Sequence, residues 1–266
     1  MNIVVVSDLD GTLLDHETYS HAAAAEALDL LRARGIPLVL SSSKTAAEIA
    51  PLRAELGFSN CPAIVENGAG LLEPEDGAQS DDGPTDYERL RRALDSLPED
   101  LRESFEGFGD WSACDVSART GLSLEAAARA MQRRFSEPGV WTGTAGDLDR
   151  FLANLAHSGI SAVQGGRFLT LSFGADKAGR LAEIRRRYDR PRAPAFIVAL
   201  GDAPNDMAML EAADFAVIVA NPAHDPLPAL DGEMAGRIVR SRFTGPSGWN
   251  DSLLSFLESD RIRTTG

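Results

Sequence analysis

The first third of the chain alternates short apolar runs with amphipathic stretches. Apolar runs that are rich in β-branched residues predict buried strands at residues 3–6, 36–42 and 63–68. Between these runs, apolar residues at helical spacing predict helices over 21–34 and 45–56. This alternation of strands and helices is typical of a parallel sheet that is covered by helices on both faces.

The pattern changes near residue 73, where an acidic, turn-rich stretch indicates a boundary or an exposed loop. The following segment mixes predicted helices at 87–97, 123–135 and 147–159 with short strands near 139–142, 160–164 and 166–173. The first pattern then returns, with a helix at 176–188, a strand at 195–202, a helix at 205–213 and a strand at 215–221. We therefore predict an α/β fold whose core is split by an inserted α/β module, with core residues 1–80 and 169–266 around inserted residues 81–168.

Composition and charge narrow the possible functions. The 266 residues carry a formal net charge of −14, which disfavours a nucleic-acid partner because such proteins present a basic surface. No stretch is long and apolar enough to span a bilayer, and the N-terminus lacks the basic and apolar regions of a secretory signal. We therefore expect a cytoplasmic protein without membrane association. The two cysteines, Cys61 and Cys114, are distant in sequence and predict reduced thiols rather than a disulfide or a zinc site.

Two carboxylates follow the first predicted strand. Asp8 and Asp10 are two residues apart, so in an extended segment both side chains point to the same side. Gly11 permits a sharp turn, and ligands of parallel sheets bind at the carboxyl ends of the strands. On its own, this pair would favour a solvated turn or a helix N-cap over a ligand site.

A second group of polar residues follows the strand at 195–202. Asp202, Asn205 and Asp206 lie at this strand end and at the start of the next helix. An N-cap would explain Asp206 alone, but carboxylates at two strand ends of one sheet favour a site for Mg²⁺, which prefers oxygen ligands.

Two further segments suit an anion. The strand at 36–42 runs into Ser42, Ser43 and Lys44, whose hydroxyl groups and amides at a helix start can bind phosphate oxygens. Lys177 opens a predicted helix, although cations normally favour helix C-termini, which suggests that its charge is held for an anion. A serine-rich loop and a surface lysine are the simpler alternatives.

Taken in order, these motifs resemble those of the haloacid dehalogenase-like hydrolase superfamily. DLDGT at 8–12 resembles the first motif, Ser42 the second, Lys177 the third and GDAPND at 201–206 the fourth. Most of the chain is also similar to the mannosyl-3-phosphoglycerate phosphatase family, through VENGAG (65–70), GLSLEAAARAMQRRFSEP (121–138), GGRFLTL (165–171) and GPSGWN (245–250). This likeness implies a Rossmann-like core with a type IIB α/β cap inserted between the second and third motifs.

The resemblance also implies a mechanism. Asp8 would be the nucleophile that forms an aspartyl-phosphate, and Asp10 would be the general acid and base. Mg²⁺ would be held by Asp8, Asp202 and the backbone carbonyl of Asp10, with Asp206 close by. Ser42 and Lys177 would bind the transferring phosphoryl group.

Substrate choice is expected to lie mainly with the cap. In the cap, the candidates are Arg133, Glu137, Gly166 and Arg167, since an arginine can grip a carboxylate or phosphate with two hydrogen bonds. For Arg133, a solvated helix face is an equally good explanation. At the core strand ends, the candidate substrate-binding residues are Ser43, Lys44, Glu66, Asn67 and Asn205.

The resulting hypothesis is a Mg²⁺-dependent phosphatase of mannosyl-3-phosphoglycerate, whose partner is a small phosphorylated sugar. Glucosyl-3-phosphoglycerate or a disaccharide phosphate are the alternative substrates. A phosphomutase and a non-catalytic binding protein are the competing classes, the latter disfavoured by the intact acid pair. The sequence leaves the oligomeric state open.

Overall fold

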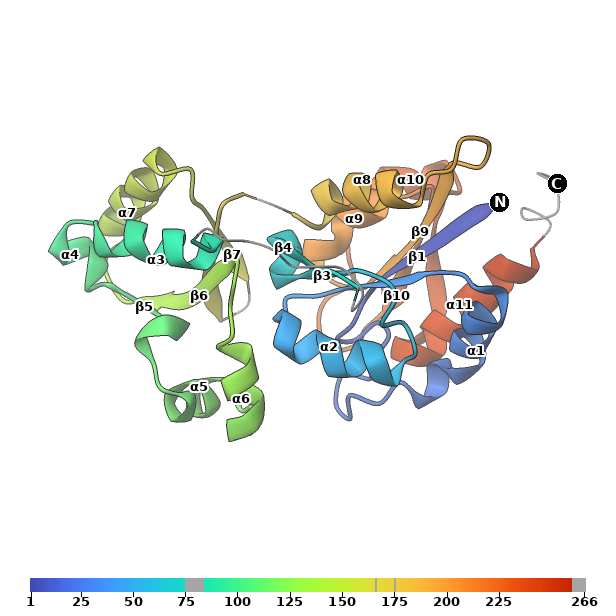
Figure 1. Ribbon diagram of the computed structural model, residues 1–266, viewed down its shortest axis with the longest axis horizontal. Coiled ribbons are helices and arrows are strands. Elements are labelled where there is room, and N and C mark those ends of the chain that lie inside the picture. The colour runs from blue at the N-terminus through green and yellow to red at the C-terminus, as the bar shows by residue number, and fades with distance from the viewer. Residues whose placement is uncertain (75–83, 166, 175, 260–266) are drawn as a thin grey trace.

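The computed structural model describes residues 1–74, 84–165, 167–174 and 176–259, and these build two sheets (Figure 1). The larger sheet has seven strands in the order β11-β10-β9-β1-β2-β3-β4, and all neighbouring pairs are parallel except β3 with β4. Its strands are β1 (Asn2–Asp8), β2 (Leu38–Ser41), β3 (Ala63–Val65), β4 (Gly70–Leu72), β9 (Ala195–Gly201), β10 (Phe215–Ala220) and β11 (Ile238–Thr244). The predicted α/β fold with a parallel-sheet core is confirmed.

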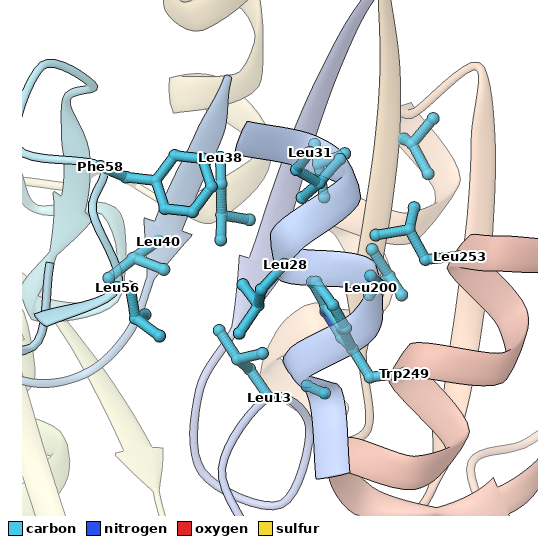
Figure 2. Close-up of a cluster of buried hydrophobic side chains, with 14 of the residues drawn as sticks. Leu13, Leu28, Leu31, Leu38, Leu40, Leu56, Phe58, Leu200, Trp249 and Leu253 are labelled. Carbon is cyan, nitrogen blue, oxygen red and sulfur yellow. The ribbon is translucent and has the colours of Figure 1, made fainter. Parts of the chain in front are cut away.

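Helices cover both faces of this sheet, because alternate residues of each buried strand point to opposite faces. Val5 packs in one apolar cluster with α1 (Ala25–Arg34), α2 (Ala46–Glu55) and α11 (Gly245–Glu258). Figure 2 shows Leu28 and Leu31 of α1 close to Trp249 and Leu253 of α11 in this cluster. The neighbouring Val4 and Val6 pack in the other cluster, with α8 (Lys177–Tyr188), α9 (Met207–Ala212) and residues beside the short α10 (Asp231–Met234). Short 3-10 turns complete this part: η1 (Ala22–Ala24), η2 (Glu66–Gly68) and η4 (Pro204–Asp206).

The second sheet is antiparallel, with four strands in the order β5-β6-β8-β7. They are β5 (Phe105–Gly107), β6 (Ser136–Trp141), β7 (Ser161–Gly165) and β8 (Phe168–Ser172). One apolar cluster packs α3 (Asp86–Asp95) and α7 (Ala145–His157) on this sheet, and another packs α5 (Ala113–Thr120) and α6 (Leu124–Ala130), with α4 (Glu99–Arg102) and η3 (Phe108–Asp110) beside them. We call this sheet with α3–α7 the cap. It lies beside the β3–β4 end of the core in Figure 1.

The domain boundaries remain a prediction. The first, at residues 80 and 81, falls outside the described residues. The second, at 168 and 169, falls inside β8, which pairs with β6 and β7 in the cap sheet up to Ser172. None of the helices in the described residues has both the length and the apolar character needed to span a bilayer.

Two predicted elements end at least three residues earlier than expected. The helix predicted over 123–135 ends at Ala130, and the strand predicted over 63–68 ends at Val65. In the second case the chain turns because Glu66 and Asn67 adopt left-handed backbone angles, with φ of 51° and 59°. The two early ends meet, since the carboxylate of Glu66 is hydrogen-bonded to the segment that follows α6.

Asp110 holds the cap together by an ionic network that is sensitive to acid. Its carboxylate accepts hydrogen bonds from Arg91 and Arg102, both at 2.6 Å, and from the backbone N–H of Gly107 at 2.9 Å. Burial alone would raise the pKa of Asp110, but these donors outweigh it and lower the pKa to about 2. A carboxyl group with a lowered pKa in the folded state stabilises the fold above its unfolded pKa, and this contribution is lost as the pH falls toward the folded pKa.

We therefore expect Asp110→Asn to lower the melting temperature at neutral pH, with a difference from wild type that shrinks as the pH falls from 3.8 to about 2. Thermal unfolding of both proteins across this range would check it. Asp149→Asn, at an exposed position of α7, is the matched control. A difference between wild type and Asp110→Asn that stays constant with pH would contradict the account.

Candidate active site

A buried lysine lies between two carboxylates at the carboxyl ends of neighbouring strands. The Nζ of Lys177, the first residue of α8, is 2.7 Å from Asp8 Oδ1 at the end of β1 and 2.6 Å from Asp206 Oδ1 in η4. Lys177 is 2% exposed, Asp8 8% and Asp206 0%. Because β1 and β9 are parallel neighbours, their ends meet at one edge of the sheet, as the sequence pattern predicts.

A third carboxylate, from Asp202, completes this group. Asp202 is 2% exposed, and its Oδ1 accepts a hydrogen bond from Thr12 Oγ1 at 2.5 Å. Its Oδ2 is 2.8 Å from Asn221 Nδ2 and 2.9 Å from His224 Nε2. These three side chains fix the orientation of the Asp202 carboxylate.

The loop that follows β1 can pass close to Asp202 only because it contains Gly11. Gly11 has a φ of 85°, and a Cβ atom there would lie 2.2 Å from Asn221 Nδ2 and 3.0 Å from Asp202 Oδ2. Glycine meets both the backbone angle and the close contact. This explains why the pair Asp8 and Asp10 is followed directly by a glycine.

The three acids fit a divalent cation. Asp8, Asp202 and Asp206 each offer a carboxylate oxygen, and these oxygens lie within 4.8 Å of one another. Burial and then the neighbouring Asp206 and Asp202 raise the pKa of Asp8 well above its usual value, although Lys177 acts in the opposite direction. One lysine thus does not balance three buried carboxylates, and a hard cation with oxygen ligands would relieve their repulsion.

Asp10 faces a different cation. The Nζ of Lys44 lies 2.8 Å and 2.5 Å from its two carboxylate oxygens, and 5.5 Å from the centre of the Tyr19 ring. Burial opposes the charge on Lys44, but Asp10 outweighs it and raises the pKa of this lysine. Asp8 and Asp10 therefore have different cationic partners, Lys177 for Asp8 and Lys44 for Asp10.

Ser42 lies in a loop that is tied to η2. Its N–H donates to Ile64 O at 3.0 Å, and its carbonyl accepts from Asn67 N at 2.9 Å. Ser42 Oγ accepts from Lys44 N at 3.2 Å, which leaves its O–H to donate to another group. Asn205 Nδ2 donates to Asn67 Oδ1 at 3.2 Å, so the structure brings these two predicted substrate-binding residues together. Ser43 is exposed in the same loop.

The cap candidates are placed differently from one another. Arg133 is 3.3 Å from the carboxylate of Glu66, so these two candidates contact each other. Glu137 is fully buried inside the cap, where it accepts hydrogen bonds from Arg91 at 2.9 Å and from Gly109 N at 2.8 Å. Arg167 donates to the carbonyls of Arg119 and Thr120 at the end of α5, and Gly166 lies outside the described residues. The structure does not bring Glu137 and Arg167 together with the acids of the core.

Sequence reasoning missed two residues that contact Asp202. Asn221 is the last residue of the strand predicted at 215–221, just as Asp202 is the last residue of the strand predicted at 195–202, so the strand-end rule that selected Asp202 also applies to Asn221. His224 gave no such signal, because a lone histidine in a loop is usually a surface residue. The hydrogen bond to Asp202 is the main cause that raises the pKa of His224.

Comparison with known proteins identifies the family of the chain. A family model described as haloacid dehalogenase-like hydrolase matches residues 5–106 and 141–230. The chain belongs to this family, and it is a hydrolase of phosphoric monoesters. Among curated proteins, it is 30% identical to the glucosyl-3-phosphoglycerate/mannosyl-3-phosphoglycerate phosphatase of Methanococcoides burtonii, over 97% of this chain and 98% of that protein.

Solved structures share the fold over nearly the whole chain. Thermoplasma acidophilum 0175 is 20% identical with a TM-score of 0.64, over 97% of this chain and 99% of that one. The sucrose-phosphatase of Synechocystis, solved with sucrose and phosphate, is 14% identical with a TM-score of 0.59, over 96% and 98% of the two chains. At these identities the likeness concerns the fold alone.

Cation binding by Asp8, Asp202 and Asp206 can be tested by a measurement that does not depend on turnover. A divalent cation that binds only the folded protein should raise its melting temperature, by about 2.7 kcal/mol of stability at a hundredfold excess over Kd. We expect this rise with MgCl₂ for wild type and its loss in Asp202→Asn, with Asp225→Asn as an exposed control in a neighbouring loop. Equal rises in wild type and Asp202→Asn, or none in either, would contradict a cation site at these acids.

Proposed function

We propose that the protein is a Mg²⁺-dependent phosphatase that hydrolyses mannosyl-3-phosphoglycerate to mannosylglycerate and phosphate. The observation that carries this proposal is the buried ion pair between Lys177 and Asp8, in contact with Asp206 and close to Asp202. The substrate class is supported by the relative of nearly full-length coverage that is named for glucosyl- and mannosyl-3-phosphoglycerate. The more general statement is that the substrate is a sugar phosphate, and mannosyl-3-phosphoglycerate is the particular sugar phosphate that we propose.

In the proposed reaction, Asp8 is the nucleophile. Its carboxylate oxygen attacks phosphorus and forms an aspartyl-phosphate, while the bond between phosphorus and the glycerate oxygen breaks. Water then attacks this phosphorus, releases phosphate and regenerates the Asp8 carboxylate. Lys177, 2.7 Å from Asp8 Oδ1, favours the ionised form of this carboxylate and offers positive charge to the phosphoryl oxygens.

Asp10 is the proposed general acid and base. As the acid it gives a proton to the leaving glycerate oxygen, and in the second step it takes a proton from the attacking water. Lys44, which contacts both carboxylate oxygens of Asp10, would hold this side chain in place between the two steps. Asp10 is also close enough in sequence to Asp8 for both to serve one phosphorus centre.

Asp8, Asp202 and the backbone carbonyl of Asp10 would hold Mg²⁺, with Asp206 nearby. When bound, the ion supplies positive charge that stabilises the transferring phosphoryl group. Ser42 would donate its O–H to a phosphoryl oxygen, since its Oγ already accepts from Lys44 N. Ser43 and Lys44 follow Ser42 in the same loop, Asn67 N donates to Ser42 O, and Asn205 contacts Asn67. These residues are the core candidates for substrate contact.

Glucosyl-3-phosphoglycerate is the second candidate substrate, because the name of the relative from Methanococcoides burtonii includes both sugars. The two substrates share the 3-phosphoglycerate group and differ only in the sugar. Their discrimination would depend on contacts to the sugar, which the phosphate-binding residues of the core do not provide.

The substrate proposal is tested by phosphate release from a panel of esters in the presence of Mg²⁺. The panel contains mannosyl- and glucosyl-3-phosphoglycerate, sucrose phosphate and simple hexose phosphates. We expect the highest kcat/KM for mannosyl-3-phosphoglycerate, and loss of all turnover on addition of a chelator. A flat profile, or a preference for a hexose phosphate or sucrose phosphate, would overturn the substrate but not the phosphatase class. No turnover of any ester would overturn the enzyme proposal as a whole.

A further inference from the structure

A carboxylate of the core accepts hydrogen bonds from backbone N–H groups of the cap. Glu66 lies in η2, directly after β3, and is 2% exposed. Its Oε1 accepts a hydrogen bond from Arg134 N at 2.9 Å. Its Oε2 accepts from Phe135 N at 3.2 Å, Ser136 N at 2.8 Å and Ser136 Oγ at 2.7 Å.

The cap segment 133–136 is built as an anion site. Three successive backbone N–H groups converge on one carboxylate, which is the geometry that proteins use to bind anions. The guanidinium of Arg133 adds positive charge, with its Nε 3.3 Å from Glu66 Oε2 and its side chain only 6% exposed. Arg133 also donates to Ser136 Oγ at 2.9 Å and to Ser43 O at 3.4 Å, so it bridges the cap and the core.

The backbone of Glu66 is strained and tied to the phosphate-binding loop. Glu66 and Asn67 both have positive φ, an arrangement that persists in residues other than glycine only where other contacts impose it. Glu66 N donates to Lys44 O at 2.9 Å, and Asn67 N donates to Ser42 O at 2.9 Å. Glu66 therefore contacts the cap through its side chain and is hydrogen-bonded through its backbone to the loop that carries Ser42.

Two neighbouring contacts also join the core and the cap close to Glu66. Thr45 Oγ1, at the start of α2, donates to Arg129 O near the end of α6 at 2.9 Å. The Phe135 ring packs so closely on Gly70 that a Cβ atom there would lie 2.2 Å from it. These two contacts lack a charged group, whereas Glu66 brings a carboxylate to the interface, so we expect the loss of Glu66 to cost more than the loss of either of them.

We propose that Glu66 is a positioning residue that sets the cap over the active site, through a clasp formed by its carboxylate and the cap segment 133–136. The proposal rests on the proposed function and deepens it. Glu66 and Arg133 affect the substrate by holding the cap in register with the Ser42 loop, rather than by contacting the sugar. Substrates whose recognition needs the cap depend on this clasp, whereas small phosphate esters that contact only the core depend on it much less.

The test uses Glu66→Gln, which keeps the shape of the side chain but replaces one charged acceptor by an amide donor facing the cap N–H groups. Hydrogen bonds to charged groups contribute about 1.5–3 kcal/mol, which corresponds to roughly 10- to 100-fold. We therefore expect kcat/KM for mannosyl-3-phosphoglycerate to fall at least about tenfold further than kcat/KM for p-nitrophenyl phosphate. We also expect the amides of 134–136 to exchange with solvent deuterium faster than in wild type.

Two further variants make the result specific. Ser136→Ala removes one of the donors and leaves the charge, so it should give the same pattern with a smaller ratio, and it replaces Glu66→Gln if that variant does not fold. Glu125→Gln removes an exposed cap carboxylate that is paired with Arg129, and it should leave both the kcat/KM ratio and the exchange at 134–136 as in wild type.

The outcomes separate the clasp from the substrate proposal. Equal loss of kcat/KM on both substrates with unchanged amide exchange, or no loss on either, would overturn the clasp. If wild type does not hydrolyse mannosyl-3-phosphoglycerate, the substrate is wrong, and the amide exchange of 134–136 still decides the clasp. Faster exchange at 134–136 in Glu66→Gln but not in Glu125→Gln supports it, and unchanged exchange in both variants overturns it.

Discussion

The ion pair of Lys177 with Asp8 and Asp206 is the interaction on which the site depends. Three carboxylates at one sheet edge repel one another, and each loses solvation when it is buried. A lysine that is 2% exposed and lies 2.7 Å from Asp8 and 2.6 Å from Asp206 offsets part of this cost. Its position follows from the fold, because α8 starts where the chain returns from the cap to the core.

The burial of three carboxylates at one sheet edge also explains which charged and polar residues lie around them. Asp202 is stabilised by neutral or weakly basic donors, namely Thr12, Asn221 and His224, rather than by a second lysine. The group therefore keeps an excess of negative charge that suits a hard divalent cation. Lys44 pairs with Asp10 at a separate position, so the two acids of the first motif have different partners and can take different chemical roles.

Much of the core was predictable from sequence because its signals are local. A buried strand that ends in a carboxylate and a glycine marks both the element and the position of the site, and parallel pairing brings Asp8 and Asp202 to one edge. Lys177 was predictable because a cation at a helix start is unusual without an anion beside it. The contact of Lys177 with Asp206 as well as Asp8 follows the same logic.

The remaining features depend on contacts between distant segments. No local pattern indicates that Glu66 bonds the backbone after α6, which shortens both the predicted strand and the predicted helix. The sequence predicts Glu137 and Arg167 as substrate-binding residues of the cap, Arg167 because it lies between glycines and an apolar strand. In the structure Glu137 accepts hydrogen bonds from Arg91 and from Gly109 N inside the cap, and Arg167 donates to backbone carbonyls at the end of α5, so both residues bind other parts of the cap.

The central claim is that Asp8 attacks phosphorus, and trapping the acyl phosphate tests it most directly. The enzyme would be mixed with substrate and Mg²⁺, quenched in acid within one turnover and reduced with borohydride, which converts a phosphorylated aspartate to homoserine. Peptide mass spectrometry would then locate the change, with Asp8→Asn as the control. The account predicts homoserine at position 8 in wild type and none in the variant. Phosphate release with position 8 unmodified, or modification at another acid, would contradict it.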